Sequence, residues 1–368
     1  MINLNIAVIG AGNIGTLLAA NLSKRNKVYL FTRNKNMNQM IDVYDKDENL
    51  LFTSRLEKIC NEYDELKNCE YIFITYPSNV WHDKCDEISK FLNNESKIIF
   101  VPSMGGKEYM CKKIKENNII IGMQRVPYVA RLKEKGKSVY MLDEKKELFI
   151  SLINSSNLDY VTNIEKMLNI KCTYIQNYLN LTLTPSNPIL HTTRIYSMFK
   201  DNDFYDHEPF FYSEWDEISA NTLFKCDYEL QKLCQSLNKI DLSYVKSLKE
   251  HYEADTEEKF VKKMKSIESF KKIKAPVEEK NGKFFPDYTS RYFLEDFPFG
   301  LLIIKGFSVI CDVETPTIDL IIMWVQKKLN KEYMIDNKLI GKDLTETGIP
   351  QNYGITTKED IYHFYCNC

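Results

Sequence analysis

The sequence lacks the features that mark a membrane-spanning or nucleic-acid-binding protein. No segment approaches the roughly 18 uninterrupted apolar residues of a membrane helix, and the longest apolar runs are interrupted by Lys305, Gly306 and Asp319. Lys and Arg number 49 against 51 Asp and Glu, so the net charge of −2 provides no attraction to nucleic acid or to an anionic membrane surface. We therefore expect neither a membrane nor a nucleic acid as a partner.

No CxxC pair occurs among the 10 cysteines. The N-terminal residues also lack the basic head and small-residue exit of a cleavable secretion signal, because a strand-like segment follows at once. These two absences favour reduced cysteines in a cytoplasmic protein over disulfides. The terminal pair Cys366 and Cys368 offers only two ligands at a chain end, and we predict no metal site there or elsewhere.

Internal repeats and low-complexity tracts are also absent. The chain has 368 residues, of which 44% are hydrophobic and 27% charged, values that are ordinary for a globular protein. This length exceeds what one hydrophobic core usually supports. We therefore expect two domains.

Three glycines near the N-terminus have the spacing of a dinucleotide-binding turn. Gly10, Gly12 and Gly15 form GxGxxG between an apolar run at residues 6–9 and a helical pattern. Gly10 permits the tight turn, Gly12 lets the backbone approach a pyrophosphate, and Gly15 permits close helix–strand packing. This context favours dinucleotide binding over a purely structural turn. The expected cofactor contacts are Gly10, Ala11, Gly12, Asn13, Ile14 and Gly15.

The end of the second predicted strand, residues 27–33, favours NADP(H) over NAD(H). An acidic residue at this position grips the ribose of NAD, but here Thr32 and Arg33 occupy it, with Lys35 two residues further on. A cationic side chain at this position suits a 2′-phosphate. NAD(H) remains an alternative because an arginine can also stack on adenine, and both cations can also be solvated loop residues.

Further strands are predicted at residues 71–77, 97–103 and 118–128. Each ends in proline or a small polar residue at the sheet edge where the cofactor of such folds binds. Tyr76 and Pro77 are therefore expected to line the path toward the nicotinamide. After an alternating segment at 139–150, residues 164–175 are typical of a helix followed by a last strand.

From about residue 179 the pattern becomes helical. Residues 216–238 place five apolar side chains near one face, namely Ile218, Leu223, Leu230, Leu233 and Leu237. Residues 249–280 are rich in Lys and Glu and indicate a solvated helix or a mobile connection. The predicted fold is α/β, with an N-terminal Rossmann domain (a doubly wound, mainly parallel sheet) over residues 1–178 and an all-α domain over residues 179–368.

His191 is a candidate catalytic residue because of its position in the sequence. It follows Asn187 and Pro188, which we expect to cap and begin a helix near the boundary between the two predicted domains. A histidine in the first turn of such a helix can exchange protons with a substrate. A lone histidine is, however, more often a structural residue.

Three charged residues interrupt the aromatic segment 290–300. Arg291 can bind a carboxylate through two hydrogen bonds, and Asp296 can fix the tautomer of an imidazole and stabilise its charged form. Together with a histidine they suit hydride transfer to a carbonyl or imine on a carboxylate-bearing substrate. The alternative is an internal ion pair between Arg291 and Asp296.

The ordered set of motifs resembles the octopine/nopaline (opine) dehydrogenase family over nearly the whole chain. The supporting segments are "GAGNIG" at 10–15, "NPILH" at 187–191, "FYSEW" at 211–215, "SRYFLEDFPFG" at 290–300, "TPTIDLII" at 315–322 and "GKDLTETGI" at 341–349. The family joins the amine of an amino acid to a 2-oxo acid and reduces the resulting imine with NAD(P)H. The expected partners are thus two small-molecule substrates, and the chain is expected to act as a monomer or homodimer.

The resemblance implies roles for individual residues. His191 is similar to the family's catalytic histidine, which gives a proton during reduction and takes one during oxidation. Asp296 corresponds to its orienting partner and Arg291 to the carboxylate clamp, with Glu295 as a structural neighbour. These implications favour the site over the internal ion pair.

Two departures from the family concern the 2-oxo acid. Better-known members have a glutamine before the glycine turn where this chain has "PSMGG" at 102–106, and a threonine where it has Arg125. Both positions help to hold the oxo acid in those members. Arg125 therefore either contributes a second cationic contact or forms a salt bridge within its domain.

Two other functions fit parts of the sequence. A ketopantoate reductase-like 2-oxo acid reductase shares the N-terminal pattern, although we find no counterpart of its catalytic lysine and spaced asparagines. A non-catalytic NADP(H)-binding sensor would give no chemical reason for the presence of His191, Arg291 and Asp296 together. The aromatic and acidic residues at 204–215 are compatible with a cationic or aromatic amino acid as the amine, and no residue decides between them.

Overall fold

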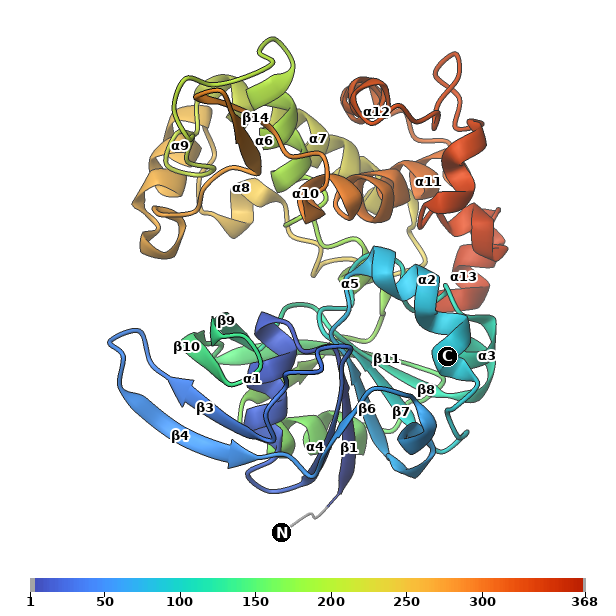
Figure 1. Cartoon of the computed structure of the whole chain (residues 1–368). Coiled ribbons are helices and arrows are strands. Elements are labelled where there is room, and N and C mark those ends of the chain that lie inside the picture. Colours follow the sequence, from blue (N-terminus) through green and yellow to red (C-terminus); the bar gives the residue numbers. More distant parts are fainter. Residues whose placement is uncertain (1–3, 367–368) are drawn as a thin grey trace. The chain divides into compact units, whose positions relative to one another are not determined.

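The computed structural model describes residues 4–366, which form two compact units (Figure 1). The first unit extends to Thr182 and the second begins at Leu183. Within residues 4–366, no helix has the length and apolar character needed to cross a membrane. Of the terminal cysteine pair, Cys366 ends the last helix and is exposed, whereas Cys368 lies outside the described residues.

The first unit is built on an eight-stranded sheet in which every pairing is parallel except that of β8 with β11, so β11 and β12 run opposite to the other six strands. Along the sheet the strands are β12 (Lys171–Tyr174), β11 (Glu147–Ile153), β8 (Ile119–Met123), β7 (Lys97–Phe100), β6 (Tyr71–Ile74), β1 (Asn5–Ile9), β2 (Lys27–Phe31) and β5 (Lys58–Cys60). The central strand β1 is completely buried from Ile6 to Ile9 because both faces of the sheet are covered. The predicted mainly parallel sheet is confirmed.

Helices cover the two faces of this sheet (Figure 1). On one face α1 (Asn13–Leu22) contacts α4 (Asp159–Leu168), and on the other α2 (Ser78–Ser89) contacts α3 (Lys112–Asn117). The short helix α5 (Leu179–Thr182) ends the unit. The predicted helix and last strand at 164–175 are confirmed by α4 and β12, with Asn169 in a left-handed conformation (φ 58°) between them.

A second sheet in this unit was not predicted. Its order is β4 (Leu50–Arg55), β3 (Met40–Tyr44), β10 (Ser138–Glu144) and β9 (Tyr128–Glu134), and all four strands contact α1. The prediction of one strand over 118–128 is wrong, because β8 ends at Met123 and the chain enters the second sheet at Tyr128. Pro127 lacks the N–H that a continuous strand would require, and a continuous apolar run does not reveal such a break.

The second unit is helical apart from one hairpin, β13 (Val277–Lys280) with β14 (Lys283–Pro286). Its helices are α6 (Leu190–Phe199), α7 (Glu217–Ser236), α8 (Leu248–His251), α9 (Glu257–Ser266), α10 (Arg291–Leu294), α11 (Leu302–Ile310), α12 (Pro316–Lys328) and α13 (Lys358–Cys366). Helix α7 contacts α6, α9, α11 and α12. The unit is therefore organised around α7.

The burial of α7 agrees with its predicted apolar face at most positions. Leu223, Leu230 and Leu233 are buried, but Ile218 is 64% exposed. Ile218 lies in the first turn of the helix, two residues after the capping residue Asp216, where it points away from the core. The Lys- and Glu-rich segment contains the amphipathic helix α9, which buries Phe260 and Met264, so part of it is the solvated helix that was predicted.

Candidate active site

The glycine turn after β1 is tightly packed at two of its three glycines. Gly10 has φ +106°, and a Cβ atom on Gly15 would lie 1.9 Å from the carbonyl oxygen of Gly10. By contrast, a Cβ atom on Gly12 would meet no atom within 4 Å. Gly10 and Gly15 are thus required by the fold itself, whereas Gly12 keeps open space at the N-terminus of α1.

The start of α1 has the donors that a diphosphate requires. The first backbone bond of the helix runs from the amide of Thr16 to the carbonyl of Gly12 (3.0 Å), so the amides of Asn13, Ile14 and Gly15 have no partner within the helix. The Asn13 side chain accepts a hydrogen bond from the Leu132 amide (2.9 Å) and fixes α1 to β9. Ala11 and Ile14 pack against the core of the unit. These residues fit a dinucleotide, whose diphosphate would rest on the free amides.

Substitution of Gly12 and Gly15 by alanine is expected to have different consequences. Gly12→Ala should leave the free energy of unfolding nearly unchanged but weaken cofactor binding about tenfold or more, because a methyl group would separate the diphosphate from its charge-assisted donors. Gly15→Ala should instead destabilise the protein by about 1–3 kcal/mol through overpacking. Urea unfolding and calorimetric titration with the cofactor measure both effects. Equal effects of the two substitutions on stability would contradict the assignment.

The end of β2 is cationic. Arg33 and Lys35 are both exposed, and the hydroxyl of Thr32 accepts a hydrogen bond from the Asn34 amide (3.1 Å). A pocket of about 560 Å³ next to this end of the strand is lined by three lysines, Lys35, Lys58 and Lys137. Because Lys58 pairs with Glu65 (2.6 Å) and Lys137 with Glu134 (2.5 Å), Arg33 and Lys35 are the residues here that suit an anionic group.

Residues after β6 lie against the glycine turn. A Cβ atom on Gly10 would be 3.2 Å from the ring of Tyr76, and the Thr75 hydroxyl donates to the carbonyl of Ile9 (2.9 Å). Pro77 directly precedes α2. Tyr76 thus lies beside the turn where the diphosphate is expected.

Lys107 is a buried residue of this region that the sequence did not single out. Its ammonium group donates to the carbonyls of Tyr76 (2.8 Å) and Pro102 (3.0 Å), at the ends of β6 and β7. The preceding Gly105 and Gly106 have positive φ, as the predicted close turn requires. Arg125 is half-buried and lies between β8 and β9, two residues after Met123.

In the second unit, His191 and Asp296 are in direct contact although 105 positions separate them. Nδ1 of His191 lies 2.8 Å from Oδ2 of Asp296, and the side chains are only 15% and 8% exposed. With the carboxylate ionised, Nδ1 carries a proton and donates a hydrogen bond to Asp296. This arrangement leaves Nε2 as the nitrogen that exchanges a proton.

The backbone around Asp296 allows its side chain to reach His191. A π-helical turn at Phe297–Leu301 follows α10, and its Leu301 amide donates to the Asp296 carbonyl (2.9 Å). A Cβ atom on Gly300 would lie 3.3 Å from Cγ of Pro188, which is tighter than most such contacts. Gly300 therefore allows the segment to approach the chain just before His191.

The prediction that Asn187 caps a helix beginning at Pro188 is wrong. Helix α6 begins at Leu190 and has no side-chain cap. Asn187 contributes its backbone carbonyl, which accepts from the His191 amide (3.1 Å), while the Ile189 amide donates to Pro185 in a preceding turn. His191 nevertheless lies in the first turn of the helix.

Arg291 pairs with Glu295 and not with Asp296. Its Nε donates to Oε2 of Glu295 (2.9 Å), and its Nη2 forms an ion pair with the same oxygen. The Arg291 side chain is 69% exposed, whereas that of Glu295 is almost buried. The guanidinium is thus held at one edge by a buried carboxylate and keeps an exposed surface.

The charges around His191 act on Asp296 in opposite directions. Burial raises the pKa of Asp296, and the charge and hydrogen bond of His191 oppose this effect. The negative charge of Glu295 adds to the increase in pKa, and the positive charge of Arg291 reduces it. The positive charge of Arg291 therefore favours the ionised form of Asp296, and its loss would favour the protonated form.

Tyr212 is a site residue that the sequence did not single out. Its hydroxyl lies 3.1 Å from Nε2 of His191, and its ring stacks on Phe270 at a centroid distance of 4.1 Å. Burial raises the pKa of Tyr212 well above its usual value, so the hydroxyl is neutral and donates to the unprotonated Nε2. His191 is thus hydrogen-bonded at both ring nitrogens.

Buried Arg194 fixes the loop that carries Tyr212. Its guanidinium donates to the carbonyls of Phe211 (3.0 Å) and Glu214 (2.8 Å) and to the hydroxyl of Ser219 (3.0 Å). Arg194 lies one turn after His191 on α6. One helix therefore positions both the imidazole and the loop that presents the tyrosine.

Two family models match this chain, one in each half. "NAD/NADP octopine/nopaline dehydrogenase, alpha-helical domain" matches residues 174–329, and "Ketopantoate reductase PanE/ApbA" matches residues 6–150. Octopine dehydrogenase from Pecten maximus is 26% identical over 316 residues, which are 80% of this chain and 79% of the relative. Tauropine dehydrogenase from Arabella iricolor is 28% identical over 316 residues, 79% of each chain.

The fold is also that of a solved octopine dehydrogenase, described with NADH and pyruvate. The TM-score is 0.85 at 24% identity, with 98% of each chain covered. A Rossmann-type unit followed by this helical domain defines a class of NAD(P)-dependent dehydrogenases, and their cofactor is a nicotinamide dinucleotide. Within this class, residues 174–329 match the octopine/nopaline dehydrogenase model, and the chain is similar to octopine and tauropine dehydrogenases over about four fifths of its length.

Proposed function

We propose that the protein is an opine dehydrogenase, an oxidoreductase acting on CH–NH bonds that couples an amino acid to a 2-oxo acid. The observation that carries the proposal is the contact of His191 with buried Asp296, 2.8 Å apart, in the family's helical domain. We assign dinucleotide binding to residues 1–178 and substrate binding to residues 179–368.

The reaction has two parts that place different demands on the protein. The amine adds to the carbonyl of the oxo acid and water leaves, giving an imine. The imine carbon then accepts a hydride and its nitrogen takes up a proton, giving a secondary amine. The reduced nicotinamide supplies the hydride when bound. Proton transfer is the task of His191, whose Nε2 gives a proton in reduction and takes one in oxidation, while Asp296 stabilises the charged imidazole.

Tyr212 is proposed as the residue that orients His191 before substrate binds. Its hydroxyl donates to Nε2 (3.1 Å) and holds the ring at the nitrogen opposite Asp296. A substrate oxygen or nitrogen with the same hydrogen-bonding capacity replaces the hydroxyl during the reaction. Tyr212 is thus a positioning residue, and His191 remains the proton donor.

Arg291 is proposed as the carboxylate clamp. Glu295 fixes the Nε edge of its guanidinium, and the remaining donors of the exposed side chain suit a substrate carboxylate. Arg125 is proposed as a second cationic contact to the 2-oxo acid, at the position where better-known members have a threonine. A salt bridge within its own unit is the competing role for Arg125.

NADP(H) is the proposed form of the cofactor, and Arg33→Ala tests this choice. The exposed Arg33 and the lysine-lined pocket near Lys35 suit a 2′-phosphate. We expect the substitution to raise the Michaelis constant for NADPH about tenfold and to leave that for NADH unchanged. Initial-rate kinetics with each cofactor measure the effect. An equal increase for both cofactors would refute contact with the 2′-phosphate.

A substrate panel tests the proposed reaction as a whole. NADPH oxidation is followed with mixed amino acids and 2-oxo acids, each also supplied alone, and products are identified by mass. An opine dehydrogenase requires both substrates and forms a secondary amine. Turnover with ketopantoate alone would favour the 2-oxo acid reductase, and cofactor binding without any turnover would favour a sensor.

A further inference from the structure

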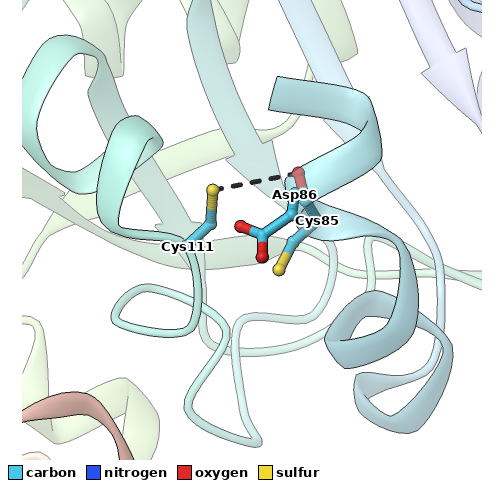
Figure 2. A group of neighbouring side chains, drawn as sticks. All are labelled: Cys85, Asp86 and Cys111. Atoms are coloured by element: carbon cyan, nitrogen blue, oxygen red, sulfur yellow. Dashed lines mark hydrogen bonds between the residues drawn. The ribbon is translucent and has the colours of Figure 1, made fainter. Parts of the chain in front are cut away.

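Three potential metal ligands lie together in the first unit, on residues that the proposed cofactor site does not use. They are Cys85 and Asp86 near the end of α2 and Cys111 just before α3. One ligand atom of each residue lies within 4.8 Å of those of the other two. Figure 2 shows the carboxylate of Asp86 between the two sulfur atoms in this view. The three side chains therefore converge on a common point.

Backbone contacts hold the two cysteines in place. The Cys111 thiol donates to the carbonyl of Cys85 (3.8 Å, dashed in Figure 2), and the Cys85 thiol is 3.8 Å from the Met110 carbonyl. The indole of buried Trp81 donates to the Lys107 carbonyl (3.1 Å) and fixes α2 to the segment before Cys111. The ligands are thus preorganised by the fold.

The surroundings combine buried soft ligands with an opening to solvent. Cys85 and Cys111 are 3% and 1% exposed, whereas Asp86 is exposed. Tetrahedral zinc sites have Zn–S distances of about 2.3 Å, so their sulfur atoms lie about 3.8 Å apart. Separations within 4.8 Å can therefore reach this geometry through a shift of about 1 Å or less.

We propose that Cys85, Asp86 and Cys111 bind a thiophilic divalent cation of the zinc type, with water as the fourth ligand. Two thiols lose their protons as the metal–sulfur bonds form, and the carboxylate of Asp86 supplies the third bond. No redox change is involved. No metal site was predicted here from the sequence, because the two cysteines are 26 positions apart and form no CxxC pair.

The bound cation would fasten α2 to the segment that contains Lys107. Tyr76 and Pro77 directly precede α2, and Lys107 holds the Tyr76 carbonyl. The metal therefore has a structural role. It holds α2, which directly follows the proposed cofactor contacts Tyr76 and Pro77, and it takes no part in proton or hydride transfer. This inference does not depend on the proposed function.

Cobalt titration of the full-length protein tests the site. The protein is stripped with a chelator under a phosphine reductant and then titrated with Co²⁺. We expect one equivalent to produce the visible bands of tetrahedral cobalt and the near-ultraviolet bands of thiolate ligation, and zinc to bleach them. Cys85→Ser and Cys111→Ser should each lose these bands, and Asp86→Asn should weaken the affinity. Cys172→Ser, at a half-buried cysteine in β12, is the matched control and should retain them.

Thiol labelling of the wild-type protein tests the site without relying on variants that fold. Zinc should protect Cys85 and Cys111, but not Cys172, from alkylation, as mapped by peptide mass. It should also raise Tm, because it binds the folded state selectively. Absence of thiolate bands at saturating cobalt would overturn the proposal. So would unchanged bands in Cys111→Ser, or labelling of both cysteines at the same rate with and without zinc. A Cys85–Cys111 disulfide that forms with peroxide while cobalt fails to bind would identify a redox pair instead.

Discussion

Replacement of His191 by alanine is expected to lower kcat by roughly 10²-fold or more while leaving cofactor affinity unchanged. An imidazole can both give and take a proton at neutral pH. Buried Asp296 holds Nδ1 of His191 at 2.8 Å. Without it, the carbonyl and imine steps depend on water for their protons. Steady-state NADPH oxidation with the substrate pair found in the panel measures the loss.

Two measurements separate this catalytic role from damage to the fold. Calorimetric titration of His191→Ala with the cofactor should give the wild-type affinity. Asp296→Asn should lower kcat to a similar degree, because an amide no longer stabilises the charged imidazole that proton transfer requires. Full activity of His191→Ala would exclude the imidazole as proton donor.

Tyr212→Phe should change the pH dependence of catalysis more than its maximum rate. The hydroxyl donates to unprotonated Nε2 and so favours the neutral imidazole. Its removal takes away this hydrogen bond, so the pH profile of kcat/KM should shift while kcat at the optimum changes little. Phenylalanine retains the stacking on Phe270. An unchanged profile would show that Tyr212 does not act on His191.

The cofactor turn could be predicted from sequence because its parts are neighbours along the chain. Gly10, Gly12 and Gly15 follow an apolar strand and open a helix, and the same residues form the turn in the structure. The contact of His191 with Asp296 is different. Because 105 positions separate the two residues, composition and spacing could not predict this contact. Only the resemblance of the ordered motifs to a known family indicated it.

The remaining features depend on contacts that no local pattern encodes. Lys107 is an ordinary lysine in sequence, and its role arises because two strand ends present carbonyls to it. The loop of Tyr212 meets His191 through the anchoring of Arg194. The second sheet joins β3 to β10 across nearly 100 residues of chain. Such pairings are set by tertiary packing, which overrides local preference.

Arg291→Ala is expected to lower kcat/KM on the order of 10²-fold. Each charge-assisted hydrogen bond to a carboxylate is worth about 1.5–3 kcal/mol, and every 1.4 kcal/mol is tenfold. The substitution has a second consequence, because buried Glu295 loses its ion pair with Arg291. Loss of the positive charge of Arg291 should also raise the pKa of Asp296 further, since that charge lowers it.

The double variant Arg291→Ala/Glu295→Gln separates these two contributions. Neutralising Glu295 removes the buried negative charge that Arg291 balances, so the double variant should recover stability and the wild-type pH profile. It should not recover the lost substrate affinity, because no guanidinium remains to bind the carboxylate. The kcat/KM of Arg291→Lys should lie between those of the wild type and Arg291→Ala, since an ammonium keeps the charge but not the two-point geometry. If the double variant regained wild-type kcat/KM, Arg291 would serve only to neutralise Glu295. If calorimetry showed that Arg291→Ala loses cofactor affinity instead, the guanidinium would belong to cofactor binding and the carboxylate clamp would have to lie elsewhere.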